Sequence, residues 1–216
     1  GCDIECADDA ICLKSGRDAD GLRVNRPTEN VVIKNCRVGI AAGLVVIGSE
    51  TSGGIRNVKV LNCRADAGCE EIVRFKTKVG RGGVVEKIYI SNIHMLDIPG
   101  DAINFTMFYG GKAPLEADGA AAEARAHPVS VETPQFRDIH IWKVVCRGAK
   151  NAIMLQGLPE LPIRDIHLKD VAITSQHGVV LIDGEGITFE NVRVDNANGE
   201  PLKTIRVKNS ELNLLK

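Results

Sequence analysis

Two adjacent carboxylates, Asp8 and Asp9, stand at the start of the apolar run Ala10–Leu13. Adjacent aspartates repel each other and are poor strand formers, so their place at the lip of a strand needs a reason. Because two neighbouring carboxyl groups cannot easily both be charged, such a pair can hold one group protonated and the other ionised. That arrangement suits general acid–base chemistry, although acidic pairs are also common in solvated turns.

The composition limits the class of protein. The 216 residues are enough for one sizeable core, and they are 44% hydrophobic but only 4% aromatic, so the core must consist mainly of aliphatic side chains. The 22 glycines and eight prolines imply many turns. A net charge of −1 does not select nucleic acid or an anionic membrane as partner, and no apolar run approaches the roughly 20 residues that span a bilayer. We expect neither nucleic acid nor membrane binding.

Six segments of the chain share one apolar pattern. They are 30–38, 57–65, 87–95, 138–146, 165–173 and 186–194, and their first apolar residues are separated by 27, 30, 51, 27 and 21 positions. A period in the twenties is typical of a solenoid, in which each unit stacks on the next. The interval of 51 predicts a full turn plus an insertion.

Within each segment, apolar residues occupy offsets 0, +2, +5 and +7, which indicates two short strands with a corner between them. The corner position holds Asn35, Asn62, Asn92, Lys143, Asp170 and Asn191. Asn and Asp tolerate the left-handed backbone that a sharp bend needs, and stacked asparagines can hydrogen-bond from rung to rung. The pattern predicts an all-β, right-handed parallel β-helix. A β-sandwich would not explain the recurring corner, and no helical pattern supports a leucine-rich repeat.

A third strand follows each pair, and hydroxyl endings align its first three copies at Ser15, Ser49 and Thr77. Alternation then places three columns outside, namely Lys14–Gly48–Lys76, Cys12–Val46–Arg74 and Asp8–Ala42–Glu70. With rungs about 4.8 Å apart, Asp8 should lie roughly 10–15 Å from Arg74 and Lys76 in one external groove. Asp9 has inward parity but sits at a bend, where alternation often fails. An elongated polymer lying in this groove could touch both the acids and the cations.

The cysteines, the histidines and the glutamates Glu70 and Glu71 do not predict a further functional site. Cys36, Cys63 and Cys146, three of seven cysteines, occupy apolar repeat positions, so we expect buried free thiols, with a disulfide between neighbouring rungs left open. His140 and His167 share an outward offset on successive rungs but lack a third ligand, so no metal site is expected. Glu70 and Glu71 are interpreted as stacked surface carboxylates.

Several blocks of the sequence resemble glycoside hydrolase family 28, the polygalacturonases. They are ADDAICLKSG (7–16), IGSETSGG (47–54), RFKT (74–77) and GRGGVVEKIYISNI (80–93), while FYGGKAP (108–114) and ETPQFRDIHI (132–141) resemble the bacterial branch of the family. The resemblance implies a right-handed parallel β-helix that hydrolyses α-1,4 bonds between galacturonic acid units of pectin with inversion. The partner would be a pectic polysaccharide or oligogalacturonide, with no cofactor and no metal, and the location extracellular or periplasmic.

The resemblance also implies roles for individual residues. Asp8 would protonate the leaving oxygen, and Asp9 would help to activate water, as one protonated and one ionised carboxyl are needed for inversion. Arg74 and Lys76 would hold the carboxylate of a bound sugar, which Arg can grip with two hydrogen bonds. Lys14 shares the column of Lys76 and is a weaker substrate ligand.

Tyr109 lies in the FYGGK block, within an insertion expected at 105–134. Its ring either stacks on a sugar or packs the inserted loop onto the β-helix. The Ala-rich segment Ala117–Ala126 is expected to form a short helix. We otherwise expect one β-helix domain over 1–216, acting as a monomer.

Two features depart from the family pattern. The chain begins seven residues before Asp8, so the aspartate that the family carries one turn earlier is absent, and we expect an N-terminally truncated domain. In addition, Ala42 stands in Ala41-Ala42-Gly43 where the family has the histidine of Gly-His-Gly. This second departure leaves open a catalytically impaired, pectin-binding homologue. A calcium-dependent polysaccharide lyase is a further alternative, disfavoured because no dense acid cluster is evident.

Overall fold

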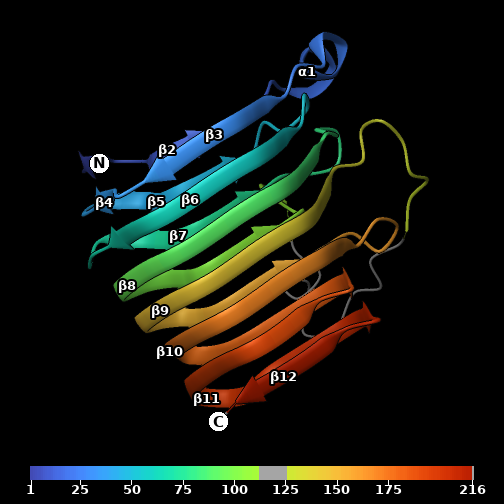
Figure 1. Cartoon of the computed structure of the whole chain (residues 1–216). Coiled ribbons are helices and arrows are strands. Elements are labelled where there is room, and N and C mark those ends of the chain that lie inside the picture. Colours follow the sequence, from blue (N-terminus) through green and yellow to red (C-terminus); the bar gives the residue numbers. More distant parts are fainter. Residues whose placement is uncertain (112–125, 216) are drawn as a thin grey trace.

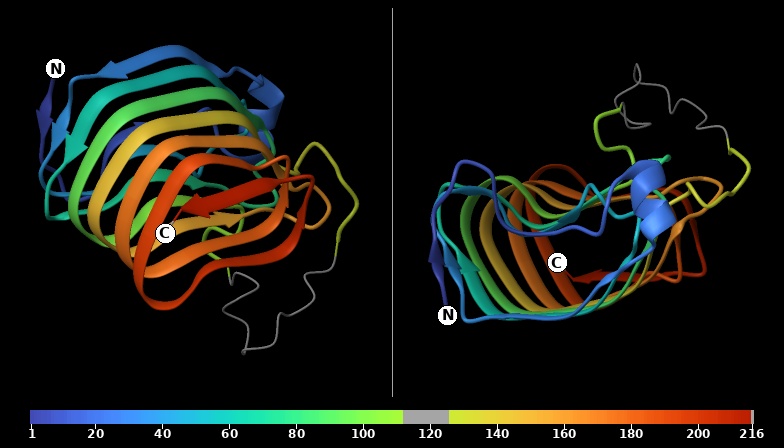
Figure 2. Two further views of the ribbon diagram at one scale, coloured as in Figure 1. Left: turned by 60° about the horizontal axis from the view of Figure 1, so that its bottom comes forward. Right: turned by 90° about the horizontal axis from the view of Figure 1, so that it is seen from above.

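The computed structural model describes residues 1–111 and 126–215, which form a stack of parallel strands wound around a common axis (Figures 1 and 2). The N- and C-termini lie at opposite ends of the stack (Figure 1). The elements are β1 (Asp3–Ile4), β2 (Asp9–Leu13), α1 (Asp18–Val24), β3 (Thr28–Lys34), β4 (Arg37–Val38), β5 (Ala41–Gly48), β6 (Ile55–Ala65), β7 (Cys69–Lys76), β8 (Val84–Thr106), β9 (Gln135–Gln156), β10 (Ile163–Glu185), β11 (Thr188–Lys208) and β12 (Glu211–Leu215).

The strands pair in parallel along two paths that merge at β8. One runs β1–β4–β6–β8–β9–β10–β11–β12, and the other joins β2, β5, β7 and β8. The repeat origins lie opposite one another, because Val58 pairs with Val31 on one side and with Ile88 on the other. The same register continues through Ile139 to Ile166. The prediction of a right-handed parallel β-helix is confirmed.

The corners are as the repeat predicts. All six residues at the corner offset have positive φ, between 52° and 56°. Their side chains form a ladder, in which Asn62 Nδ2 donates to Asn35 Oδ1 at 3.3 Å and Asn92 Nδ2 donates to Asn62 Oδ1 at 2.9 Å. A second left-handed column, which the pattern did not predict, precedes each repeat origin and includes Asn30 and Asn57. Where these two columns hold asparagine, side-chain amides link the bends of neighbouring coils.

Aliphatic columns and a few aromatic rings fill the interior. Phe75 and Phe105 stack on adjacent rungs with ring centroids 4.2 Å apart, and Phe136 meets both edge-on. All seven cysteines are free thiols, and Cys36, Cys63 and Cys146 are buried, as expected for repeat positions. The inward-facing residues of the third strand thus pack on those of the next rung.

Two segments depart from the regular coil. The seven-residue helix α1 lies beside the coil between β2 and β3 (Figure 1), where no helix was predicted. It ends at Asn25, whose φ of 48° breaks the helix and whose N–H donates to the Gly21 carbonyl at 2.9 Å. At the expected insertion, β8 ends at Thr106 and β9 begins at Gln135. The helix expected at Ala117–Ala126 lies outside the described residues except for Ala126.

Candidate active site

The face on which the sequence predicts an external groove is built by the third strand of each coil. Cys12, Val46, Arg74 and Asn104 pair in succession across β2, β5, β7 and β8, and Gly48 pairs with Lys76. These pairs reproduce the columns that the hydroxyl alignment predicted. The strands therefore carry acids and bases that are distant in sequence to neighbouring positions on one face.

Asp9 forms a buried ion pair with Lys76. Lys76 Nζ donates to Asp9 Oδ2 at 2.8 Å, and both side chains are buried, with exposed fractions of 7% and 8%. The Oδ1 atom of Asp9 is also buried and accepts no hydrogen bond from the described residues. Asp8, in contrast, is exposed, and its Oδ1 accepts the backbone N–H of Asp9 at 2.8 Å. The second acid of the pair, rather than the first, meets the cation, because the bend at Asp9 overrides its inward parity.

Arg74 is paired with an acid of its own strand. Its Nε lies 2.9 Å from Glu71 Oε2, with exposed fractions of 22% for the arginine and 16% for the glutamate side chain. Asn104 Nδ2 donates to Glu71 Oε1 at 3.3 Å and to Asp101 Oδ2 at 2.8 Å. The interpretation of Glu71 as a surface carboxylate is wrong, because β7 turns it into the groove wall, while Glu70 is exposed as expected.

Tyr109 closes one side of this cluster. Its ring centre lies 5.1 Å from Lys76 Nζ and 5.9 Å from Arg74 Cζ, and its backbone N–H donates to the Thr77 carbonyl at 3.0 Å. The tyrosine remains 38% exposed. The ring therefore packs beside the two cations and still offers surface to a ligand.

Lys14 lies one residue beyond β2, in line with Gly48 and Lys76. Its Nζ donates to the Gly48 carbonyl at 3.0 Å and forms an ion pair with Glu50. About half of its side chain is exposed. The ammonium is thus at the groove margin, already paired with an acid from the turn after β5.

The rung between Asp9 and Glu71 is nearly empty of side chain. Gly43 pairs with Asp9 on one side and with Glu71 on the other. A Cβ at Gly43 would lie 2.5 Å from Val46 Cγ2, so any larger residue would force Val46 to move. The Glu71 carbonyl oxygen and Asp9 Oδ1, at 3.5 and 3.7 Å, would be in ordinary contact with it. Ala42, whose N–H donates to the Asp8 carbonyl at 3.0 Å, presents only a methyl group beside Asp8.

Burial changes the acidity of several groove residues. Desolvation raises the pKa of Glu71 to about 7, although the charge of Arg74 opposes this shift. Desolvation also raises the pKa of Asp101, against the hydrogen bond from Asn151. The half-buried Cys12 thiol on β2 has its pKa raised to about 11 by desolvation. At neutral pH the wall thus contains one carboxyl group, that of Glu71, that can hold a proton.

Three residues of the cluster were not identified from the sequence as site residues, namely Glu71, Asp101 and Asn104. A signal for the first two was available, because the hydroxyl alignment that places Asp8 opposite Ala42 and Glu70 also places Asp9 opposite Gly43 and Glu71. Asp101 holds the equivalent position on the next rung, two residues before the Val73 partner Ile103. The strand register identifies these positions, but the alternation of side chains does not predict their exposure at a bend.

Two features lie outside the groove. On another face, His140 stacks between Tyr89 and His167, with centroids 5.2 and 4.7 Å away, and its Nε2 lies 2.9 Å from Asp138 Oδ1. Within residues 1–111 and 126–215, no three His, Cys, Asp or Glu side chains are grouped to hold a metal ion. The same residues contain no helix with the length and apolar character to cross a bilayer.

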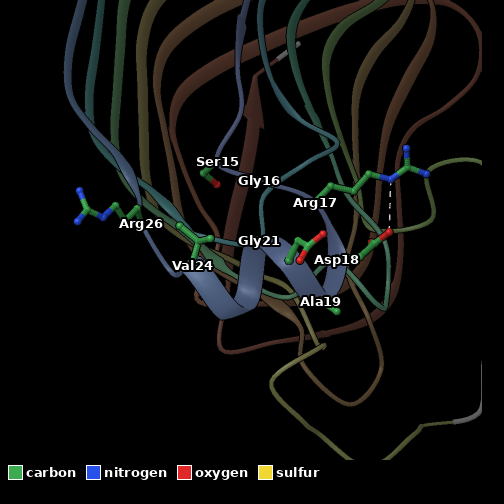
Figure 3. A pocket seen from close by; sticks show the side chains of 9 residues that line it. Ser15, Gly16, Arg17, Asp18, Ala19, Gly21, Val24 and Arg26 are labelled. Carbon is green, nitrogen blue, oxygen red and sulfur yellow. Dashed lines mark hydrogen bonds and ion pairs between the residues drawn. The ribbon is translucent and has the colours of Figure 1, made fainter.

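A separate cavity adjoins α1 (Figure 3). It is lined by Ser15, Gly16, Arg17, Asp18, Ala19, Asp20, Gly21, Val24 and Arg26. At its edge, Arg17 Nε lies 3.4 Å from Asp18 Oδ2, and Asp18 also pairs with the buried Arg81 (Figure 3). None of the predicted site residues lines this cavity.

The comparisons with known proteins agree with this geometry. Residues 1–125 match the model of glycosyl hydrolases family 28. The chain belongs to this family. It is 31% identical over 173 residues to a probable polygalacturonase of Vitis vinifera, a match that covers 80% of this chain and 33% of the relative. This family 28 chain therefore spans about a third of the length of that relative.

Two solved structures share the fold. A family 28 exopolygalacturonase of Yersinia enterocolitica superposes with a TM-score of 0.81 at 19% identity, over 96% of this family 28 chain and 35% of the other. A hyperthermoactive exopolygalacturonase of Thermotoga maritima superposes with a TM-score of 0.73 at 27% identity. This match covers 90% of this family 28 chain and 40% of the other chain. The part of the chain that matches the family model contains all six residues predicted for the site.

Proposed function

We propose that the protein is a pectin-directed glycoside hydrolase that cleaves α-1,4-galacturonosyl linkages with inversion of configuration. The observation that carries the proposal is the meeting of Asp9 and Lys76 at 2.8 Å on the face that also holds Asp8 and Arg74. An acid pair beside a buried lysine and a partly exposed arginine suits a polymer in which every sugar carries a carboxylate. Membership of family 28 supports the same reaction class.

Each residue then has a distinct task. Asp8, exposed next to Asp9, donates a proton to the leaving glycosidic oxygen. Asp9, which is paired with Lys76, helps to activate the water that attacks the opposite face of the sugar. Arg74 binds a sugar carboxylate, and Tyr109 offers its exposed surface to a sugar ring. Lys14 adds a positive charge at the margin of the groove.

The test is hydrolysis of polygalacturonate by the full chain, followed by reducing-end release and by NMR of the first anomer formed. Inversion of an α-linkage yields the β-anomer first. Because general acids contribute about 10²–10⁴-fold, Asp8→Asn should lower kcat at least about 100-fold, whereas Arg74→Ala should mainly raise KM. Asp20→Asn, an exposed aspartate on α1, is the matched control and should behave as the wild type. Release of the α-anomer first would contradict the mechanism.

The second function is binding of pectic oligosaccharides without turnover. Ala42 favours it, because the rung beside Asp8 carries a methyl group where the family carries an imidazole. In that case the protein would bind oligogalacturonate, Arg74→Ala would weaken binding, and no reducing ends would appear. Restoring the motif by Ala42→His would separate the two functions, since only an impaired enzyme would gain activity.

A further inference from the structure

The contact between Glu71 and Arg74 has no role in the proposed hydrolysis mechanism. We propose that Glu71 is a positioning residue that retains Arg74 when it is ionised and releases it to a substrate carboxylate when it is protonated. The inference rests on the proposed function, because it takes an anionic sugar as the ligand of Arg74.

The geometry of the pair favours exchange of partners. Arg74 Nε and Glu71 Oε2 are 2.9 Å apart, yet the N–H is not directed at this oxygen. Among the described residues, neither buried atom therefore has a hydrogen bond. An ion pair without aligned hydrogen bonds is weaker than the two-bond grip that a guanidinium makes with a carboxylate. A sugar carboxylate can thus satisfy Arg74 better than Glu71 does, once the charge of Glu71 is removed.

The surroundings place the titration of Glu71 in a useful pH range. Desolvation raises its pKa to about 7, and the charge of Asp101 adds to this, while Arg74, the hydrogen bond from Asn104 and the charge of Lys76 lower it. A sugar carboxylate resembles an α-carboxyl group, whose pKa is roughly 3.5, and so stays ionised throughout this range. Between about pH 6 and pH 8, the charge of Glu71 changes while that of the ligand does not.

The expected effect follows from the fraction of protein in which Arg74 is released. With a pKa of about 7, that fraction is about 0.9 at pH 6 and about 0.1 at pH 8, so the apparent Kd should rise by up to about tenfold. The measurement is calorimetric titration of the full chain with tri-galacturonate at both pH values. A fully methyl-esterified trimer has no carboxylate and should show no such rise.

Two variants carry the test. Glu71→Gln is neutral at every pH, so its Kd should remain near the wild-type value at pH 6. Glu70→Gln, the exposed neighbour on β7, is the matched control and should keep the wild-type pH response. Should Glu71→Gln not fold, Asn104→Ala serves instead, because loss of its hydrogen bond to Glu71 moves the midpoint of the response to higher pH.

The outcomes separate the two proposals. Three results would overturn the role of Glu71 alone. The wild type would bind tri-galacturonate equally at pH 6 and pH 8, or Glu71→Gln would show the same pH response as the wild type. Alternatively, Asn104→Ala would leave the midpoint of the response unchanged. Absence of binding by the wild type at both pH values would overturn the proposed function and this inference with it.

Discussion

At the residue scale, each cation of the groove already has an acidic partner within the protein. The pairs are Lys14–Glu50, Lys76–Asp9 and Arg74–Glu71. A bound galacturonate carboxylate must therefore replace or join an existing partner rather than meet a free charge. The cost of this exchange is smallest where the internal pair is poorly aligned, which singles out Arg74.

The elevated pKa of Glu71 should also affect stability. Its folded-state pKa of about 7 exceeds the ordinary value of 4.5, so the native state binds the proton more tightly than the unfolded state. The stabilisation is fully present below pH 4.5 and is lost as the pH rises to 7. At about 1.4 kcal/mol per pKa unit, the free energy of unfolding should fall by up to about 3 kcal/mol from this group.

Urea unfolding of wild type and Glu71→Gln across this pH range provides the measurement. The stability difference between the two proteins should change with pH, and Asp101, which shifts in the same direction, cancels in the comparison to first order. A difference that is constant from pH 4.5 to pH 7 would show that Glu71 titrates normally.

At the element scale, the corner asparagines combine a left-handed backbone with a rung-to-rung amide ladder. Asn62 has a φ of 56° and bonds to both Asn35 and Asn92. Asn62→Gly should lose only the ladder bonds, at a cost of about 1 kcal/mol. Asn62→Ala should cost roughly 1–2 kcal/mol more, because a Cβ without a polar group is strained in this conformation. Chemical denaturation midpoints test the order, and equal values for the two variants would show that the backbone is not the constraint.

The elements also show how far the sequence alone can be taken. The corner offset, the third-strand columns and the external placement of Arg74 followed from periodicity, because parallel in-register strands repeat the same environment at every rung. The Asp9–Lys76 contact did not follow, since it depends on the direction of the backbone at a bend. Helix α1 was not predicted because seven residues with an internal glycine are too few to show a 3.6-residue period.

At the scale of the whole molecule, each coil contacts only its neighbours, so stability should be distributed along the axis. The longest strands, β8, β9 and β10, are each covered on both sides, whereas β12 covers only part of β11. We expect amide hydrogen exchange to be slowest in β9 and fastest in β12. The expected profile falls from the centre to the C-terminal end, and uniform protection along the stack would instead indicate a single cooperative unit.

The stacking of coils in register also sets the dimensions of the groove. Because Asp9 and Glu71 are separated by the strand of Gly43, their spacing is two steps of about 4.8 Å, and it cannot be adjusted continuously by point substitution. A longer or shorter side chain shifts a functional group by less than one strand spacing. Only the gain or loss of an entire coil changes the number of rungs along the groove. The length of polymer that the protein can contact therefore changes only in steps of one coil.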